Sequence, residues 1–135
     1  MIRDITEKDL EKFLEIAGEY LGEESLENWE KYFQENPGLF LGYFSGNELI
    51  GIIFGHLNGK EAIIDGIAVL KEFWGEGIGR KLVLAFEKRA KELGAIKASV
   101  GAAIKPTSVV GFYEKCGYHV IKKKQNYWVM EKNLS

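Results

Sequence analysis

The segment that most constrains this chain is a hydrophobic run that passes through a glycine-rich turn into a predicted helix. It extends from Ala68 to Val83 and has glycines at positions 75, 77 and 79 inside the turn. Glycine has no side chain, so several backbone N–H groups of such a turn can converge on one anion. The positive end of the helix dipole lies at the same place. The segment therefore predicts a phosphate-binding turn between a strand and a helix.

The residues after the glycines exclude the two commonest nucleotide-binding motifs. A P-loop ends in Gly-Lys-Ser or Gly-Lys-Thr, whereas Gly79 is followed by Arg80 and Lys81. The dinucleotide-binding fingerprint needs glycine or alanine at position 80, where this chain has arginine. Neither motif therefore describes this turn.

The turn resembles the pyrophosphate-binding motif of the GNAT superfamily, the acyl-CoA-dependent N-acyltransferases. That motif follows a strand as Gln/Arg-x-x-Gly-x-Gly/Ala and is commonly written Arg-Gly-x-Gly-Ile-Gly. The matching residues here are Gly75, Gly77, Ile78 and Gly79. Trp74 departs from the motif, because the family usually has Gln or Arg at that position. The resemblance implies a backbone cradle for pyrophosphate without that side-chain contact.

A second segment, at positions 107–118, resembles a later helix of the same family. That helix usually ends Phe/Leu-Tyr-Glu-Lys-x-Gly-Phe, and the part from Tyr113 to Gly117 follows the pattern. Pro106 stands where the family usually has an Asn that contacts the pantetheine arm, and Thr107 or Ser108 can substitute with a hydroxyl. The two motifs occur in the family's order, about one helix and one strand apart.

The resemblance implies an α/β fold with a central, mixed, twisted β-sheet flanked by about four helices. It also implies acetyl-CoA as cosubstrate, with the pantetheine arm held by backbone groups of the preceding strand as though it were an added strand. The residues that we assign to acetyl-CoA are Ile67, Ala68, Val69, Trp74, Gly75, Glu76, Gly77, Ile78, Gly79, Arg80, Ser108 and Tyr113.

Hydrophobic periodicity and turn residues predict the order β-α-α-β-β-β-α-β-α-β-β. The first helix is capped by Thr6 and broken at Gly22, and a second helix starts at Ser25. The residues predicted to form the buried face of the first helix are Leu10, Phe13, Leu14 and Ala17. The other predicted elements are strands at 1–5, 39–44, 48–57, 61–70 and 95–102, a helix ending at Leu93, a helix at 107–116, and a hairpin of strands at 118–123 and 127–132.

Composition favours one small enzyme domain spanning all 135 residues, because 46% hydrophobic residues argue against disorder. The chain has no run of 18 apolar residues and no signal-peptide pattern, so we expect a cytoplasmic protein without a membrane span. The only cysteine is Cys116 and the only histidines are His56 and His119, so neither a disulfide nor a metal site is expected. A net charge of -2 gives no reason to expect nucleic acid as a partner.

The reaction implied by the resemblance is acyl transfer from a thioester to an amine. The amine must attack unprotonated, the tetrahedral oxyanion needs a donor, and the leaving thiolate benefits from a proton. Tyr113 occupies the family's tyrosine position, and we assign it the role of general acid. The alternative is a core tyrosine that packs beside Phe112 and Tyr118.

Three side chains and ordered water are candidates for the general base. Asp65 is a carboxylate inside an otherwise apolar strand, where burial without a partner is costly. It is expected to face a wet cleft or a donor, at the place where the family's strand splays and Gly66 would ease a bulge. The alternative is a structural Asp65 that caps a loop or pairs with a lysine. Glu61, on the same face of a regular strand, and His56, at a strand end, are the other candidates.

The acceptor is predicted to be a small cationic amine or a peptide or protein amine. In the family, the two N-terminal helices form much of the acceptor cleft. Between Gly18 and Asn36, Lys31 is outnumbered here by Glu19, Glu23, Glu24, Glu27, Glu30 and Glu35. Such a field favours a polyamine, an aminoglycoside-like molecule or a basic peptide, and the alternative is a solvated helix surface. The residues that either line this cleft or pack in the core are Tyr20, Trp29, Tyr32 and Phe33.

Two functions follow from these observations. The favoured one is an active N-acetyltransferase that uses acetyl-CoA, and the alternative is a CoA-binding regulatory module with the same fold but without efficient catalysis. The apolar hairpin segment from Tyr127 to Met130 either contacts a second subunit in a homodimer or covers the domain's own core.

Overall fold

The computed structural model describes residues 1–21 and 26–135, and the strands within these residues form one mixed sheet. The strand order is β1-β2-β3-β4-β5-β7-β6. The strands are β1 (Ile2–Asp4), β2 (Phe40–Ser45), β3 (Glu48–Asn58), β4 (Glu61–Val69), β5 (Lys97–Ala103), β6 (His119–Lys123) and β7 (Tyr127–Asn133). Neighbouring strands are antiparallel except for β4 and β5, which are parallel. The predicted mixed sheet is therefore confirmed.

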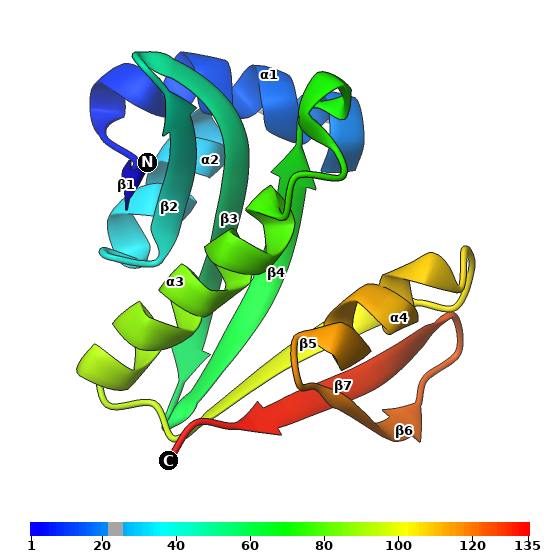
Figure 1. Ribbon diagram of the computed structural model, residues 1–135. Coiled ribbons are helices and arrows are strands. Elements are labelled where there is room, and N and C mark those ends of the chain that lie inside the picture. Colours follow the sequence, from blue (N-terminus) through cyan, green and yellow to red (C-terminus); the bar gives the residue numbers. More distant parts are fainter. Residues whose placement is uncertain (22–25) are drawn as a thin grey trace.

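Helices cover both faces of this sheet (Figure 1). The helices of the described residues are α1 (Leu10–Leu21), α2 (Leu26–Glu35), α3 (Ile78–Glu92) and α4 (Ser108–Lys115). Helices α1 and α2 lie behind the sheet in Figure 1, whereas α3 and α4 lie in front of it. The predicted order of elements is confirmed. The predicted helix break at Gly22 and helix start at Ser25 lie outside the described residues, as do Glu23 and Glu24.

The start of α1 differs in detail from the prediction. Thr6 precedes a 3-10 turn (Glu7–Asp9) that leads into α1. Its backbone N–H and its hydroxyl both donate to Asp9 Oδ2, at 2.9 and 2.8 Å. The buried residues of α1 are Leu10, Phe13, Ile16 and Ala17, so Ile16 takes the place predicted for Leu14, which is only half-buried. These four residues are spaced i, i+3, i+6 and i+7, and they lie on the helix face that contacts the sheet.

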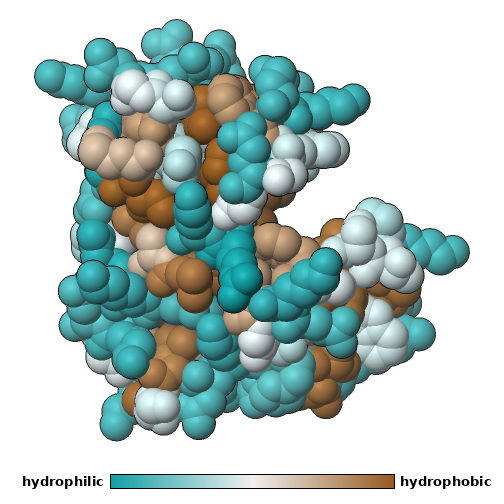
Figure 2. Space-filling view, in the orientation of Figure 1, coloured by the Kyte–Doolittle hydropathy of each residue, from teal (hydrophilic) through white to brown (hydrophobic). Residues whose placement is uncertain are grey.

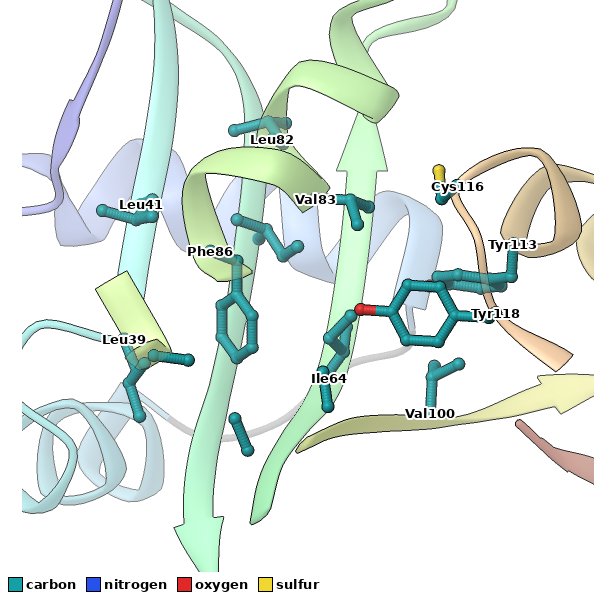
Figure 3. Close-up of a cluster of buried hydrophobic side chains, with 14 of the residues drawn as sticks. Leu39, Leu41, Ile64, Leu82, Val83, Phe86, Val100, Tyr113, Cys116 and Tyr118 are labelled. Atoms are coloured by element: carbon teal, nitrogen blue, oxygen red, sulfur yellow. The ribbon is translucent and has the colours of Figure 1, made fainter. Parts of the chain in front are cut away.

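Two hydrophobic clusters hold the helices on the sheet, one on each face. Behind the sheet, the rings of Phe13, Phe40 and Phe54 pack with centroids 5.3 to 5.4 Å apart, and Trp29 of α2 adds to them. In front, α3 packs through Leu82, Val83 and Phe86, and the cluster continues to α4 (Figure 3). The front cluster therefore joins the two halves of the sheet.

Strands β4 and β5 pair only over the first part of β4. Their register runs from Glu61 opposite Lys97 to Ile64 opposite Val100 and then ends. At the same point the register of β3 with β4 shifts, because Gly55 lies opposite Ile64 and Phe54 lies opposite Gly66. Asp65 is thus the extra residue of a β-bulge, and a bulge bends its strand and increases its twist. The second part of β4 therefore diverges from β5, as the resemblance implied.

Gly66, predicted to ease a bulge, directly follows the bulged residue and also has a role in packing. A Cβ at Gly66 would lie 2.6 Å from the Phe54 ring and 2.8 Å from Leu21 Cδ1. Glycine at this position therefore makes room for Phe54 of the rear cluster and for Leu21. The bulged residue itself is Asp65.

Gly55 provides a test of how closely β3 and β4 approach one another. A Cβ there would lie 2.0 Å from the Ile63 carbonyl oxygen and 2.8 Å from the Phe86 ring. We predict that Gly55→Ala lowers the free energy of unfolding by roughly 3 kcal/mol, because the backbone must move. In the control, Gly111→Ala, the new Cβ of α4 meets no atom within 4 Å, and we predict a gain of about 0.5 to 1 kcal/mol. Urea denaturation measures both, and a wild-type midpoint for Gly55→Ala would contradict the prediction.

Candidate active site

A pocket of about 670 Å³ lies at the divergence of β4 from β5, between the start of α3 and α4. It belongs to the hollow between the two halves of the molecule in Figure 2. The pocket is lined by Tyr20, Ile67, Ala68, Val69, Phe73, Trp74, Gly75, Gly77, Ile78, Gly79, Arg80, Phe112, Lys115 and Cys116. The pocket therefore brings together the end of β4, the glycine turn, the first turn of α3 and one face of α4.

The wall that β4 contributes is an unpaired strand edge. The Leu70 N–H donates to the Ile50 carbonyl oxygen of β3 at 2.9 Å. Backbone groups alternate in direction along a strand, so the N–H and C=O groups of Val69 and Ile67 point away from β3. They point to the side where pairing with β5 has ended at Ile64. An extended ligand can therefore hydrogen-bond to this edge as an added strand does.

The Trp74 side chain hydrogen-bonds to one backbone carbonyl of this strand edge. Its indole Nε1–H donates to the Val69 carbonyl oxygen at 2.7 Å, and its ring lies 6.4 Å from the ring of Tyr20, while 58% of the residue is exposed. The Tyr20 hydroxyl accepts a hydrogen bond from the Lys71 N–H at 2.9 Å. The structure thus places Trp74 against the end of β4 and beside α1. The sequence alone did not indicate which residues the Trp74 side chain contacts.

The glycines of the turn serve two different purposes. Gly75 and Gly77 have φ angles of +85° and +79°, a left-handed conformation that favours glycine, and a Cβ at either would meet no atom within 4 Å. Gly77 is the N-cap of α3. Gly79 is needed for space, because a Cβ there would lie 3.2 Å from the Phe112 ring of α4. The turn is thus shaped by backbone conformation, and the first turn of α3 can approach α4 closely.

The charge of the pocket is positive. Its charged lining residues among the described part of the chain are Arg80 and Lys115. The first N–H groups of α3 have no acceptor inside the helix, and the helix dipole adds partial positive charge at this end. The pocket can therefore hold a long, anionic ligand with its phosphate groups at the turn.

Tyr113 is buried in the front cluster, with 4% of the residue exposed. Its ring centroid lies 5.1 Å from that of Phe112 and 5.7 Å from that of Tyr118 (Figure 3). Burial raises the pKa of the Tyr113 phenol above its ordinary value, so the hydroxyl stays protonated at neutral pH. The ring thus packs in the core, as the alternative interpretation stated, and its assignment as general acid stays a prediction.

A buried carboxylate joins α3 to the C-terminal half of the sheet. Glu87 of α3 accepts a hydrogen bond from the Tyr118 hydroxyl at 2.8 Å and one from Lys132 Nζ at 2.9 Å. The same ammonium donates to the Cys116 carbonyl oxygen at 2.9 Å. Pairing of this kind offsets the cost of burying a charge. The network holds the end of α4 against α3, and no sequence motif indicated it.

Cys116 is a lining residue of the pocket, although only 5% of it is exposed. Burial raises the pKa of its thiol, so the reactive thiolate is a smaller fraction than for a free cysteine. We predict that the native protein reacts with an aromatic disulfide at pH 8 at least about tenfold more slowly than the urea-unfolded chain. Absorbance of the released thiol measures both rates, and equal rates would contradict the burial of Cys116.

Asp65 lies on the opposite side of β4 from the α3 cluster, with Tyr32 of α2 and His56 of β3. Tyr32 Oη donates a hydrogen bond to Asp65 Oδ2, and His56 Nδ1 lies 2.6 Å from the same oxygen. Tyr32 Oη lies 3.1 Å from His56 Nδ1. Burial and the hydrogen bond to Asp65 raise the pKa of the Tyr32 phenol. We call these three residues the Asp65 cluster, and its Tyr32 hydroxyl is a donor of the kind expected for this carboxylate.

The third candidate base is engaged elsewhere. The Glu61 carboxylate lies 3.9 Å from Lys97 Nζ, at the start of β4. Four residues of strand separate it from Asp65, which corresponds to about 13 Å. Glu61 is therefore not a member of the Asp65 cluster.

The pocket and the predicted cofactor residues overlap in part. Glu76, Ser108 and Tyr113 do not line the pocket, and the first two are exposed. Lining residues that the sequence analysis did not assign to acetyl-CoA are Tyr20, Phe73, Phe112, Lys115 and Cys116. The motif at 107–118 could have indicated the last three, because they are spaced at i, i+3 and i+4 on one face of α4.

The predicted acceptor residues divide between surface and core. Glu27, Glu30 and Glu35 of α2 are exposed, whereas Trp29, Tyr32 and Phe33 pack against the rear cluster.

In the C-terminal hairpin, Met130 is fully buried in the front cluster and Trp128 packs against it. These two residues thus cover the domain's own core, and the homodimer stays a prediction. None of the helices in the described ranges has the length and apolar character needed to cross a membrane.

A mixed sheet that opens after a bulge, with a glycine turn and a helix N-terminus facing the opening, defines the fold class of acyl-CoA-dependent acyltransferases. The sequence profile described as "Acetyltransferase (GNAT) family" matches residues 2–118, and the chain belongs to this family. The recognition of the family from the two motifs and the predicted enzyme class, an acyltransferase, are therefore confirmed.

Individual relatives agree with this membership. The spermidine N(1)-acetyltransferase of Thermoplasma acidophilum is 29% identical, over 97% of this chain and 95% of its own. The crystal structure of the PaiA N-acetyltransferase of the same organism, in complex with coenzyme A, is 28% identical with a TM-score of 0.82, over 98% of both chains. Ard1 from Thermoplasma volcanium has a TM-score of 0.89 at 22% identity, over 98% of this chain and 96% of its own, which shows the shared fold.

Proposed function

We propose that this protein transfers an acetyl group from acetyl-CoA to a primary amine by direct attack in a ternary complex. The observation that carries the proposal is the pocket at the end of β4. An unpaired strand edge leads there to a glycine turn and a helix N-terminus, and the charged lining residues of the described chain are both cations. This arrangement suits pantetheine followed by pyrophosphate. The PaiA relative is described in complex with coenzyme A, which supports the same ligand here.

The pantetheine arm, the pyrophosphate and the thioester of acetyl-CoA each have a proposed counterpart at the pocket. Backbone groups of Ile67 and Val69 hold the pantetheine arm along β4. The residues that present the turn to the pyrophosphate are Gly75, Glu76, Gly77, Ile78, Gly79 and Arg80. The thioester then lies toward the bulge at Asp65, between the diverging strands. The Ser108 hydroxyl, at the start of α4, remains a proposed contact to the arm.

The proposed chemistry uses one acid and one proton-accepting group. The amine nitrogen bonds to the thioester carbon, the carbon–sulfur bond breaks, and the electron pair stays on sulfur. Tyr113 donates a proton to this thiolate, because a phenol is protonated at neutral pH. The acceptor amine is mostly protonated at neutral pH, because alkylamines titrate near about 10.4, and the proton-accepting group lies in the Asp65 cluster.

The proposed acceptor is a cationic amine, with a polyamine first and a peptide amine second. The exposed Glu27, Glu30 and Glu35 make α2 acidic, which attracts cations. The relative from Thermoplasma acidophilum is described as a spermidine acetyltransferase, which supports a polyamine. Reaction in the cytoplasm and the absence of nucleic acid from the site are parts of the same proposal.

Calorimetric titration with acetyl-CoA, with NAD and ATP as controls, tests the cofactor. A thiol-release assay with spermidine, aminoglycosides and basic peptides then tests the reaction. We expect acetyl-CoA alone to bind, and thiol release to depend on the amine. Binding without thiol release for any amine would favour the alternative, a CoA-binding regulatory module, and absence of binding would overturn both.

The hydrogen bond from Trp74 to Val69 predicts the effect of one substitution. In Trp74→Phe the ring is kept and the Val69 carbonyl is released for the pantetheine arm. One hydrogen bond contributes about 0.5 to 1.5 kcal/mol, so we predict that acetyl-CoA binds about 2- to 10-fold more tightly. Trp128→Phe, on β7 and outside the pocket lining, is the calorimetric control. Weaker binding to Trp74→Phe would show that the indole N–H contributes to holding the ligand.

Tyr113→Phe tests the acid. We predict that turnover falls at least about tenfold while the affinity for acetyl-CoA is retained, because only the proton donor is removed. Tyr43→Phe, a half-buried tyrosine of β2, is the matched control and keeps wild-type turnover. Wild-type turnover in Tyr113→Phe would show that the residue is structural.

A further inference from the structure

The geometry of the Asp65 cluster determines which of its atoms carry hydrogen. Tyr32 Oη and His56 Nδ1 both contact Asp65 Oδ2, and an ionised carboxylate oxygen only accepts hydrogen bonds. The raised pKa of Tyr32 keeps its hydroxyl protonated, so the phenol donates to Asp65. A hydrogen must also lie between His56 Nδ1 and Oδ2, which are 2.6 Å apart. His56 is therefore in the Nδ1–H tautomer, with an unprotonated Nε2 when the ring is neutral.

We propose that His56 Nε2 is the atom that accepts the proton of the acceptor amine, and that Asp65 and Tyr32 are positioning residues that fix the tautomer and orientation of the ring. This inference rests on the proposed acetyl transfer and assigns the role of Asp65 within it. The Asp65 oxygen Oδ2 already contacts both Tyr32 and His56, so it is engaged within the cluster. An imidazole oriented by a carboxylate is a well-suited general base near neutral pH.

The proton balance of the step is as follows. One proton of the bound ammonium passes to His56 Nε2 and from there to water, and this frees the nitrogen lone pair. The lone pair forms the bond to the carbonyl carbon, and the carbon–sulfur bond breaks with its pair on sulfur. Tyr113 protonates the thiolate, and the second proton lost by the nitrogen restores the phenol through solvent. The products are the N-acetylated amine, free coenzyme A and one proton released to water.

The surroundings of His56 suit this role. The titratable groups that contact its ring, within the residues described, are Tyr32 from α2 and Asp65 from β4. The His56 side chain is 35% exposed, so solvent reaches the group that must release a proton. Asp65, which holds the ring, is the bulged residue at which β4 leaves β5. The proposed base thus lies at the opening between the strands, on the α1–α2 side of the sheet.

Nuclear magnetic resonance of histidine labelled with ¹⁵N tests the tautomer without any activity. The chain has two histidines, so His56→Gln and His119→Gln assign the two sets of ring signals. We expect the neutral His56 ring to carry its hydrogen on Nδ1. In Asp65→Asn, an amide can donate to Nδ1 and favours the Nε2–H tautomer, as an Asn in place of the triad Asp does in serine proteases. A wild-type His56 with its hydrogen on Nε2 would overturn the proposal.

Kinetics tests the role in the reaction. We expect His56→Gln to lower turnover by about 10² or more and to keep the affinity for acetyl-CoA, with partial rescue of His56→Ala by added imidazole. Tyr32→Phe is expected to lower turnover less than His56→Gln does, because the contact between Asp65 and the His56 ring remains. His119→Gln, on exposed β6, is the matched control and keeps wild-type turnover.

Different results would overturn the proposed acetyl transfer and the proposed role of His56. Wild-type turnover in His56→Gln would overturn the role of His56 and leave acetyl transfer intact. A wild-type protein that binds no acetyl-CoA and acetylates no amine would overturn the proposed function, and the role of His56 with it. Equal losses of acetyl-CoA affinity and turnover in His56→Gln would show that the residue is structural and would also overturn its role as base.

Discussion

The site depends on a single extra residue in β4. Asp65 interrupts the register of β4 with β3 at the position where pairing with β5 ends. From that point the edge of β4 is free, and the sheet opens without losing its continuity, because β4 remains paired with β3 as far as Val69. The front cluster and the Glu87 network hold the two halves together across the opening. A bulge of one residue therefore turns a continuous sheet into one with a binding pocket.

The same bulge gives the two sides of the strand different chemistry. Beyond it, the backbone of Ile67 and Val69 and the start of α3 line a positively charged pocket. On the other face, Asp65 contacts His56 of β3 and Tyr32 of the acidic helix α2. A thioester bound on one side and a cationic amine on the other would meet at the end of the β4–β5 pairing. The proposed ternary complex thus follows from where the strands separate.

Departures from the family pattern are accommodated by the surrounding structure. Trp74 replaces a Gln or Arg of the motif, and its indole donates to the end of β4 and lies beside Tyr20. The glycine turn keeps the backbone conformation of Gly75 and Gly77 that opens it toward the pocket. The shape of the turn therefore depends on the backbone of these glycines.

The sequence by itself determined the order of elements, the fold class and the glycine turn between β4 and α3. These features are encoded locally, by hydrophobic periodicity and by the glycines around position 77. Only the tertiary structure decided the partners of side chains that are far apart in the chain. Tyr32 of α2 and His56 of β3 meet Asp65 of β4 on one face of the sheet, and Glu87 of α3 meets Lys132, which is 45 positions away on β7. Such pairs depend on register and packing, and a short sequence pattern carries no signal for either.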